Sequence, residues 1–374
     1  MMSNRIRFGI IGAGWMGSEL MEKVLLNPDA EIRGVFEPDV ENANVAKGRF
    51  QLTDDLFVGS VEELMTRIDA LVIASPNDLH GVQSIAAMEK GIHVFCEKPA
   101  ATRFDELLRQ KQLDERTPRL VTFVDYILQF DDMEQRLHGL IEQKVFGEIS
   151  HIQINYRHAI NIAGKKIWKT GVEAIGMGPI HSLHLILWHM DPHQLRRVYS
   201  TAMEPQGSNF RIPPIYDVHL EFDNGATGIM PCNIETPNGY DVYHSIYGSE
   251  GWFVFDPQAY VSEEDPFVNF KLRYKSRVTT NDQWIYPLHR DLCPAADRWP
   301  VEMSFPDSGD IIQHKTRAVI DHFIDCIKKG EKSPLGFSHS FKTAEAVFAV
   351  LVSARCKQPV DLPLQSAFVE KILN

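Results

Sequence analysis

The chain has 374 residues, a hydrophobic content of 44%, a charged content of 24% and a formal net charge of -12. This composition is that of a soluble globular protein, and the length exceeds what one hydrophobic core usually supports, so we expect two domains. An acidic surface gives no general attraction to nucleic acid or to anionic membranes. The longest late apolar run, residues 346–352, is far shorter than the ~20 residues that span a bilayer. We therefore expect neither a nucleic-acid partner nor a membrane segment.

The use of cysteine indicates a reducing compartment. The cysteines are odd in number, scattered and without CxxC spacing: Cys96, Cys232, Cys293, Cys326 and Cys356. Neither a disulfide framework nor a zinc site follows from such a pattern. We expect a cytoplasmic protein without a metal.

A glycine-rich turn follows the first strand-like segment, residues 5–11. It reads Gly12-Ala13-Gly14-Trp15-Met16-Gly17 and opens a segment of helical spacing, residues 18–26. Glycines at this spacing permit a tight turn and a close approach of the backbone to a pyrophosphate, which then lies on the helix N-terminus. A turn without a ligand is the simpler alternative, and the segments that follow argue against it.

A carboxylate at the end of the second predicted strand bears on the choice of cofactor. Residues 31–36 have strand character, and Glu37 follows twenty residues after Gly17. A carboxylate there accepts hydrogen bonds from the adenosine ribose and repels a 2'-phosphate. The position favours NAD. NADP stays an alternative because Lys47 or Arg49 would suit a phosphate, whereas Arg33 lies too early in the strand.

Strands and helices alternate through the first third of the chain. Buried strands are predicted at residues 70–74, 92–96 and 120–124, with helices at 81–90 and 104–112. This alternation is typical of βαβ units around a parallel sheet. We therefore expect a dinucleotide-binding Rossmann domain over residues 1–123 and a second domain over residues 124–374.

The strand at residues 92–96 ends in Glu97-Lys98-Pro99. In an open parallel sheet, ligands lie in the crevice beyond the carboxyl ends of the strands. Glu97 and Lys98 would therefore project towards a cofactor or substrate. An ordinary surface ion pair is the alternative, and the sequence leaves open whether the Lys98–Pro99 bond is cis.

Four motifs in this order resemble the Gfo/Idh/MocA family, whose members include glucose-fructose oxidoreductase and inositol dehydrogenase. They are Gly12-x-Gly14-x-x-Gly17, Glu37-Pro38-Asp39, the segment from Ala74 to His80 and Glu97-Lys98-Pro99. The resemblance implies an NAD(P)-dependent dehydrogenase acting on CH-OH groups, with these cofactor-binding residues: Gly12, Gly14, Trp15, Met16, Gly17, Glu37, Ser75, Asn77, His80, Glu97 and Lys98.

Period-two alternation dominates the remainder of the chain, as in Tyr216, Val218, Leu220 and Phe222. Turns are predicted at residues 223–225 and 248–251, and helices at 133–143, 315–328 and 340–355. Alternation indicates an antiparallel sheet with one buried face. The resemblance implies a second α+β domain with an open, mostly antiparallel sheet, whose exposed face forms a homodimer or homotetramer.

A histidine pair forms the second candidate constellation. His181 and His184 are spaced i, i+3 and share one face of a predicted helix. The family's pattern here is Asp-x-Gly-x-His-x-x-Asp, so His181 keeps the histidine, while Met177 and His184 replace the aspartates. A buried structural histidine is the alternative for each. The resemblance implies catalytic roles for Lys98 and His181, and these substrate residues: Lys98, Tyr126, Gln129, Arg157, Trp168, His181 and His184.

The chemistry that follows is oxidation of a secondary alcohol in a sugar, polyol or sugar acid. His181 has a suitable pKa for taking the hydroxyl proton, and Lys98 would orient the oxygen, but Lys98 is equally an alternative proton carrier. Two further hypotheses stay open: a non-catalytic NAD-binding regulator or sensor of the same fold, and an enzyme that recycles tightly bound NAD.

Overall fold

The computed structural model describes residues 5–373 except 161, 163–168, 170, 237–239, 242, 262–269, 281–283, 286–302 and 306–315. The chain divides into two compact units. The first comprises Met1–Ile127 with Lys315–Ala344, and the second Leu128–His314 with Glu345–Asn374. The division differs from the expected domains in two respects. The first crossing lies at Ile127 rather than at residue 123, and a late segment returns to the first unit.

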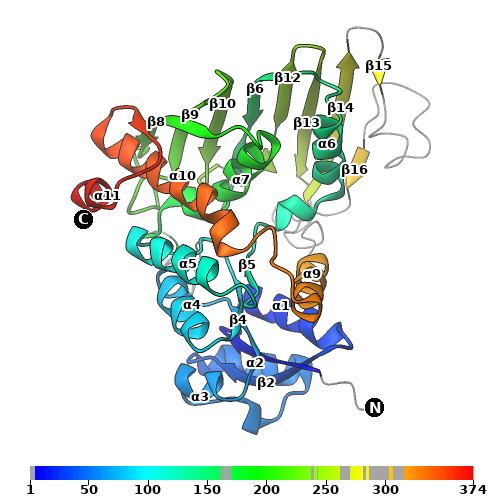
Figure 1. Ribbon diagram of the computed structural model, residues 1–374, viewed down its shortest axis with the longest axis vertical. Coiled ribbons are helices and arrows are strands. Elements are labelled where there is room, and N and C mark those ends of the chain that lie inside the picture. Colours follow the sequence, from blue (N-terminus) through cyan, green and yellow to red (C-terminus); the bar gives the residue numbers. More distant parts are fainter. Residues whose placement is uncertain are drawn as a thin grey trace. The chain divides into compact units, whose positions relative to one another are not determined.

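The first unit holds a parallel sheet with the strand order β2-β1-β3-β4-β5. Its strands are β1 Ile6–Ile11, β2 Ala30–Phe36, β3 Ala70–Ile73, β4 His93–Cys96 and β5 Thr122–Val124. Its helices are α1 Trp15–Leu26, α2 Val40–Phe50, α3 Val61–Met65, α4 His80–Glu89, α5 Phe104–Arg116 and α9 Thr316–Lys329. Figure 1 shows α4 beside α5 and α1 beside α9. The predicted Rossmann fold is confirmed.

Four phenylalanines explain why the late segment belongs to this unit. Phe95 of β4 stacks on Phe123 of β5, with 4.8 Å between ring centroids. Phe323 of α9 meets Phe8, Phe95 and Phe123 edge-on. All four rings are completely buried. Aromatic side chains bury large apolar areas, so α9 completes the core of a sheet formed some 200 residues earlier.

A buried carboxylate anchors the chain that follows α9. Asp114 of α5 accepts hydrogen bonds from Thr122 Oγ1 (2.8 Å), Lys332 Nζ (2.7 Å) and both the backbone N–H and hydroxyl of Ser338 (2.9 and 2.6 Å). Burial alone would raise the pKa of Asp114. The donors outweigh that effect, so the pKa lies below its ordinary value. This network ties residues 332–338 to the first unit.

The second unit holds a mixed sheet whose described strands follow the order β15-β14-β13-β12-β6-β10-β9-β8-β17, with β7, β11 and β16 beside this path. The pairs β6–β10 and β7–β10 are parallel, and the other pairs are antiparallel. The strands are β6 Ile149–Ile154, β7 Tyr156–His158, β8 Leu195–Met203, β9 Ile215–Phe222, β10 Thr227–Asn233, β11 Tyr240–Asp241, β12 His244–Gly248, β13 Gly251–Val261, β14 Phe270–Thr280, β15 Trp284–Ile285, β16 Met303–Phe305 and β17 Val360–Asp361.

One face of this sheet is covered by helix. Along β9, Tyr216, Val218, Leu220 and Phe222 are buried while the residues between them are exposed, as the alternation predicts. α7 (Pro179–His189) packs on β6, β7 and β10 (Figure 1). The other helices that lie wholly or partly in this unit are α6 Asp132–Glu142, α10 Phe337–Cys356 and α11 Ser366–Leu373. None of the described helices combines the length and apolar character required to cross a membrane.

Candidate active site

The glycine turn has the geometry of a phosphate cradle. Gly12 adopts φ +87°, and a Cβ there would collide with the Ala74 carbonyl. A Cβ at Gly17 would collide with the Gly12 carbonyl, so these two glycines are required for the turn itself. A Cβ at Gly14 would meet no described atom within 4 Å, which leaves the turn open to a ligand. α1 begins at Trp15 without an acidic residue in its first turn, and such a helix end favours an anion.

Glu37 lies directly beside this turn. Its carboxylate accepts hydrogen bonds from the backbone N–H of Ala13 (2.6 Å) and of Asp39 (2.8 Å). Each oxygen keeps a further lone pair for a ribose hydroxyl. The residues present therefore fit the adenosine half of a dinucleotide.

The three basic residues considered for a 2'-phosphate all pair with carboxylates. Lys47 Nζ lies 2.8 Å from Asp54, and the Arg33 guanidinium lies 2.7 Å from Glu31. Arg49 bridges Glu19 and Glu22 at 2.9 and 2.7 Å. This arrangement favours a free ribose over a phosphate.

His80 joins the segment after β3 to the turn after β4. It is 1% exposed, with Nδ1 at 2.8 Å from the Pro99 carbonyl oxygen and Nε2 at 2.9 Å from the Ser75 carbonyl oxygen. Burial lowers the pKa of His80, against the effect of these two contacts. Ser75 Oγ donates to Gln83 (2.6 Å), and Asn77 lies half-buried in a short 3-10 helix, Asn77–Leu79. His80 thus links the two segments through its two ring nitrogens.

The Glu97-Lys98-Pro99 turn lies at the carboxyl edge of the sheet, as its position directly after a buried strand predicts. The Glu97 backbone N–H donates to the Ile73 carbonyl at 2.9 Å, which continues the pairing of β4 with β3. Lys98 is half-buried, and the Lys98–Pro99 peptide bond is cis. Because β4 and β1 are parallel strands of one sheet, Lys98 follows β4 at the edge that also carries the glycine turn.

Asp125 is the residue that the motif search missed. It follows β5 directly, and its N–H donates to the Cys96 carbonyl at 2.9 Å, so it lies at the strand end next to Glu97. Burial, together with the charge of Glu97, raises the pKa of Asp125 well above its ordinary value. Burial and the same two carboxyl groups also raise the pKa of the Cys96 thiol. The sequence pattern that could have identified Asp125 is the one that identifies Glu97: a charged residue immediately after a buried strand.

The next residue, Tyr126, belongs to the core rather than to an open surface. Its ring is completely buried, and burial raises the pKa of its hydroxyl far above the ordinary range. Two other predicted substrate residues are Arg157 and Trp168. Arg157 is exposed on β7, and Trp168 lies outside the described residues.

In the second unit, two predicted substrate residues contact each other. His184 Nε2 lies 2.7 Å from Gln129 Oε1, and both side chains are buried. With the amide in this orientation, His184 donates and Gln129 accepts. His181 is also buried on α7, in which every residue except Trp188 is buried. The contact with Gln129 favours the interpretation of His184 as a buried structural histidine.

No carboxylate stands at the family's first aspartate position, and the other acidic candidate from the sequence, Glu173, is paired with other residues. Met177, at the family's first aspartate, is a buried apolar side chain. Glu173, the other acidic candidate, accepts from the Tyr216 hydroxyl (3.2 Å) and from Arg355 (3.1 Å). Within the described part of the chain, no group of three His, Cys, Asp or Glu side chains has the geometry to hold a metal ion.

A buried Glu134 fixes α7 to its neighbours. This carboxylate of α6 lies 2.8 Å from His189 Nε2 on α7 and 3.1 Å from His244 Nδ1 on β12. Burial would raise its pKa, but the two histidines lower it to about 2. The helix that carries His181 is therefore held by an ionic contact that depends on pH.

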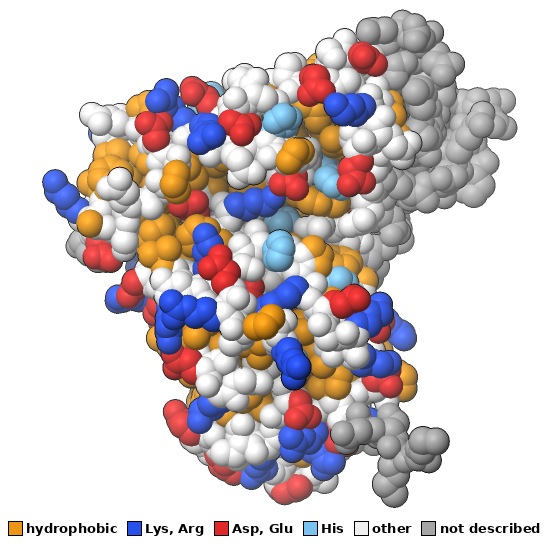
Figure 2. All heavy atoms as spheres, in the orientation of Figure 1, with side chains coloured by type: hydrophobic (Ala, Val, Ile, Leu, Met, Phe, Trp, Pro, Cys, Tyr) orange, Lys and Arg blue, Asp and Glu red, His pale blue; other side chains and the backbone are white. Residues whose placement is uncertain are grey.

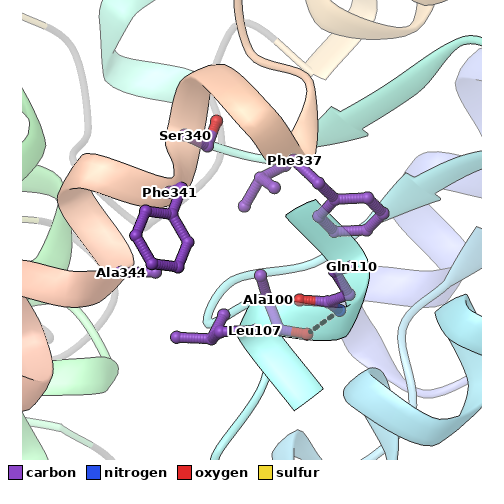
Figure 3. Close-up of a pocket in the computed structure, with 8 residues that line it drawn as sticks. Ala100, Leu107, Gln110, Phe337, Ser340, Phe341 and Ala344 are labelled. Carbon is purple, nitrogen blue, oxygen red and sulfur yellow. Dashed lines mark hydrogen bonds between the residues drawn. The ribbon is translucent and has the colours of Figure 1, made fainter. Parts of the chain in front are cut away.

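An apolar gap between α5 and α10 is lined by Leu107, Gln110, Phe337 and Phe341 (Figure 3), and it is too small for a water molecule. Figure 2 shows Lys and Arg side chains interspersed with Asp and Glu on the face in view.

Family models match both parts of the chain. A model described as "Oxidoreductase family, NAD-binding Rossmann fold" matches residues 6–125, and one for the GFO/IDH/MocA C-terminal domain matches residues 135–254. The chain belongs to the GFO/IDH/MocA family. It is accordingly an NAD-binding oxidoreductase, as the glycine turn and Glu37 indicate.

Named relatives of this GFO/IDH/MocA protein have several activities. An inositol 2-dehydrogenase/D-chiro-inositol 3-dehydrogenase of Shouchella clausii is 25% identical over 66% of this chain and 70% of its own length. A 2,7-anhydro-N-acetylneuraminate hydratase of Escherichia coli is 28% identical over 48% and 47% of the two chains. An Agrobacterium radiobacter oxidoreductase, solved with NAD+, L-tartaric acid and magnesium, has a TM-score of 0.77 at 16% identity over 96% and 98%. The last likeness shows the fold.

The Glu134 contact yields a prediction for acid stability. The folded-state pKa of about 2 lies below the ordinary carboxyl value, so the contact stabilises the fold at neutral pH and is lost as the pH falls from about 4.5 towards 2. Glu134→Gln should lower the free energy of unfolding at neutral pH by roughly 3 kcal/mol and flatten its decline in acid, measured by urea unfolding.

The matched control is Glu142→Gln, an exposed carboxylate on the same helix whose nearest histidine nitrogen is 3.8 Å away. It should change the unfolding free energy by less than about 0.5 kcal/mol. Equal acid dependence in Glu134→Gln and the unmodified protein would contradict this account.

Proposed function

We propose that the chain is an NAD-dependent dehydrogenase that transfers a hydride between nicotinamide and a secondary alcohol carbon of a sugar, polyol or sugar acid. The observation that carries the proposal is one edge of the parallel sheet, where the glycine turn, Glu37 and Lys98 follow β1, β2 and β4. The dehydrogenase name of the Shouchella clausii relative supports the substrate class.

The roles of the residues follow from their chemistry. The N-terminal end of α1 holds the pyrophosphate, and Glu37 holds the ribose. NAD supplies the hydride acceptor when bound. Lys98 orients the substrate oxygen and stabilises the negative charge that develops on it. Lys98 and His181 share the transfer of the hydroxyl proton, without the aspartates that stand at Met177 and His184 in the family's pattern.

A second function has support from one relative. The hydratase name of the Escherichia coli relative favours an enzyme that recycles tightly held NAD, with no net change of the cofactor. Such an enzyme would purify with NAD and turn over without added cofactor. A non-catalytic regulator would bind NAD without turnover, and the presence of Lys98 argues against it.

We also propose a cytoplasmic homodimer or homotetramer, assembled through the uncovered face of the second sheet. Tyr199 on β8 and Tyr247 on β12 are 38% and 41% exposed, and Tyr247 lies 6.3 Å from His151 and 6.5 Å from Trp252 between ring centroids. Exposed aromatic groups of this kind are typical of interfaces.

The oligomer has a direct test. Tyr247→Lys should place an unpaired charge in the interface and shift the mass in analytical ultracentrifugation towards the monomer. Tyr199→Lys tests the other end of the same face. An unmodified protein that is monomeric at micromolar concentration would refute the assembly.

Glu37→Ala should weaken NAD binding about tenfold or more and reduce the discrimination against NADP, because the carboxylate both orients Ala13 and repels a phosphate. Titration calorimetry with each nucleotide measures both effects. Glu41→Ala, exposed at the start of α2, is the matched control and should leave both affinities unchanged. An unaltered NAD/NADP ratio in Glu37→Ala would show that Glu37 does not contact the ribose.

Lys98→Met should reduce kcat by about a hundredfold or more while NAD still binds, because the positive charge at the reacting oxygen is lost. The assay is a panel of polyols, sugars and uronic acids with NAD, followed by nicotinamide absorbance. Lys90→Met, exposed just after α4, is the control. Full activity of Lys98→Met rules out this mechanism, and tight NAD binding without turnover on any substrate favours the regulator.

A further inference from the structure

Two buried acids meet at the ends of β4 and β5. The register pairs Cys96 with Val124, so Glu97 and Asp125 are the next residues on neighbouring parallel strands. Both backbones are fixed, Glu97 by the Ile73 carbonyl and Asp125 by the Cys96 carbonyl, each at 2.9 Å. The two side chains therefore leave adjacent strand ends in the same direction.

One carboxyl oxygen of each side chain lacks the donor that a buried carboxylate requires. Glu97 is 6% exposed and Asp125 is 2% exposed. Glu97 Oε1 and Asp125 Oδ1 are buried and accept no hydrogen bond from the described residues. Asp114 and Glu134, by contrast, are each met by hydrogen-bond donors or histidines. Two adjacent buried negative charges without such partners would be strongly destabilising.

A proton between the two acids resolves the conflict. The charge of Glu97 acts on Asp125, and two adjacent carboxyl groups avoid this repulsion only when one of them is protonated and can donate a hydrogen bond to the other. The ionisable groups that interact with the pair are Cys96 and Lys98 from the β4 segment and His80 from α4, with Tyr126 next in the chain. Of these, only Lys98 and a protonated His80 carry positive charge.

We propose that Glu97 and Asp125 share one proton at neutral pH, so that the pair carries a single negative charge beside Lys98. Asp125 is in this account a positioning residue that acts through Lys98. A single negative charge attracts the Lys98 side chain less strongly than two would, and so leaves it available to contact the substrate oxygen. The effect on catalysis rests on the proposed dehydrogenase function, but the shared proton does not.

The first test needs no substrate. Infrared difference spectra between the apoprotein in H2O and in D2O at neutral pH should contain the C=O stretch of a protonated carboxyl group, because this band shifts in D2O. The band should be absent in Asp125→Asn and in Glu97→Gln, and present in Glu115→Gln, an exposed carboxylate on α5. Absence of the band from the unmodified protein, or its persistence in both pair variants, overturns the proposal.

The second test is the pH dependence of unfolding. A folded-state pKa above the unfolded value makes stability fall as the pH rises from the ordinary aspartate value, about 3.9, to the raised value. The unfolding equilibrium constants of the unmodified protein and Asp125→Asn should therefore diverge by up to about tenfold per pH unit in that window, in favour of the variant. A ratio of the two unfolding constants that does not change with pH overturns the proposal. If Asp125→Asn folds poorly, the measurement is repeated with Glu97→Gln.

The third test uses the enzyme with NAD and its best substrate. Asp125→Asn imitates the protonated acid at every pH, so it should retain kcat near neutrality and lose an alkaline ionisation from the pH profile of kcat, with KM little changed. An identical alkaline limb in both proteins overturns the link to Lys98. Failure of every substrate would count against the proposed function alone, because the infrared and unfolding tests would still decide the shared proton.

Discussion

Parallel pairing of the strands in the first unit determines where its chemistry lies. In a parallel sheet all strands end at the same edge, so residues that follow β1, β2, β3, β4 and β5 come together although they are far apart in sequence. Gly12, Glu37, Ser75, Glu97 and Asp125 are the residues in question. The hydrophobic strands therefore serve two purposes: they form the core, and they align the polar residues that follow them.

Four buried acids among the described residues are arranged in two different ways. Asp114 and Glu134 are supplied with hydrogen-bond donors or histidines, and both have lowered pKa values. The acids at the β4 and β5 ends are instead placed against each other, and the pKa of Asp125 is raised. The first arrangement stabilises a fold, because each charge is compensated. The second stores a proton next to an amine, which is useful only where protons are transferred.

Local sequence patterns were sufficient to predict much of the first unit. The turn at Gly12 to Gly17 and the strand that precedes Lys98 depend on neighbours close in sequence, and the structure has both. Asp114 and Phe323 could not be found in the same way. Their importance arises from contacts with Lys332 and Phe95, more than 200 residues away in each case, and no periodicity reports such a pairing.

The same limit applies to the histidines of α7. Helical spacing predicted that His181 and His184 share a face, but it could not show that Gln129 accepts a hydrogen bond from His184. The contact bears on the role of His184, because a histidine that donates to a buried amide has one nitrogen fewer for a substrate. Met177, at the family's first aspartate, provides no carboxylate near His181. In the first unit, the chemistry proposed for Lys98 depends in turn on the charge that Glu97 and Asp125 carry at the ends of β4 and β5.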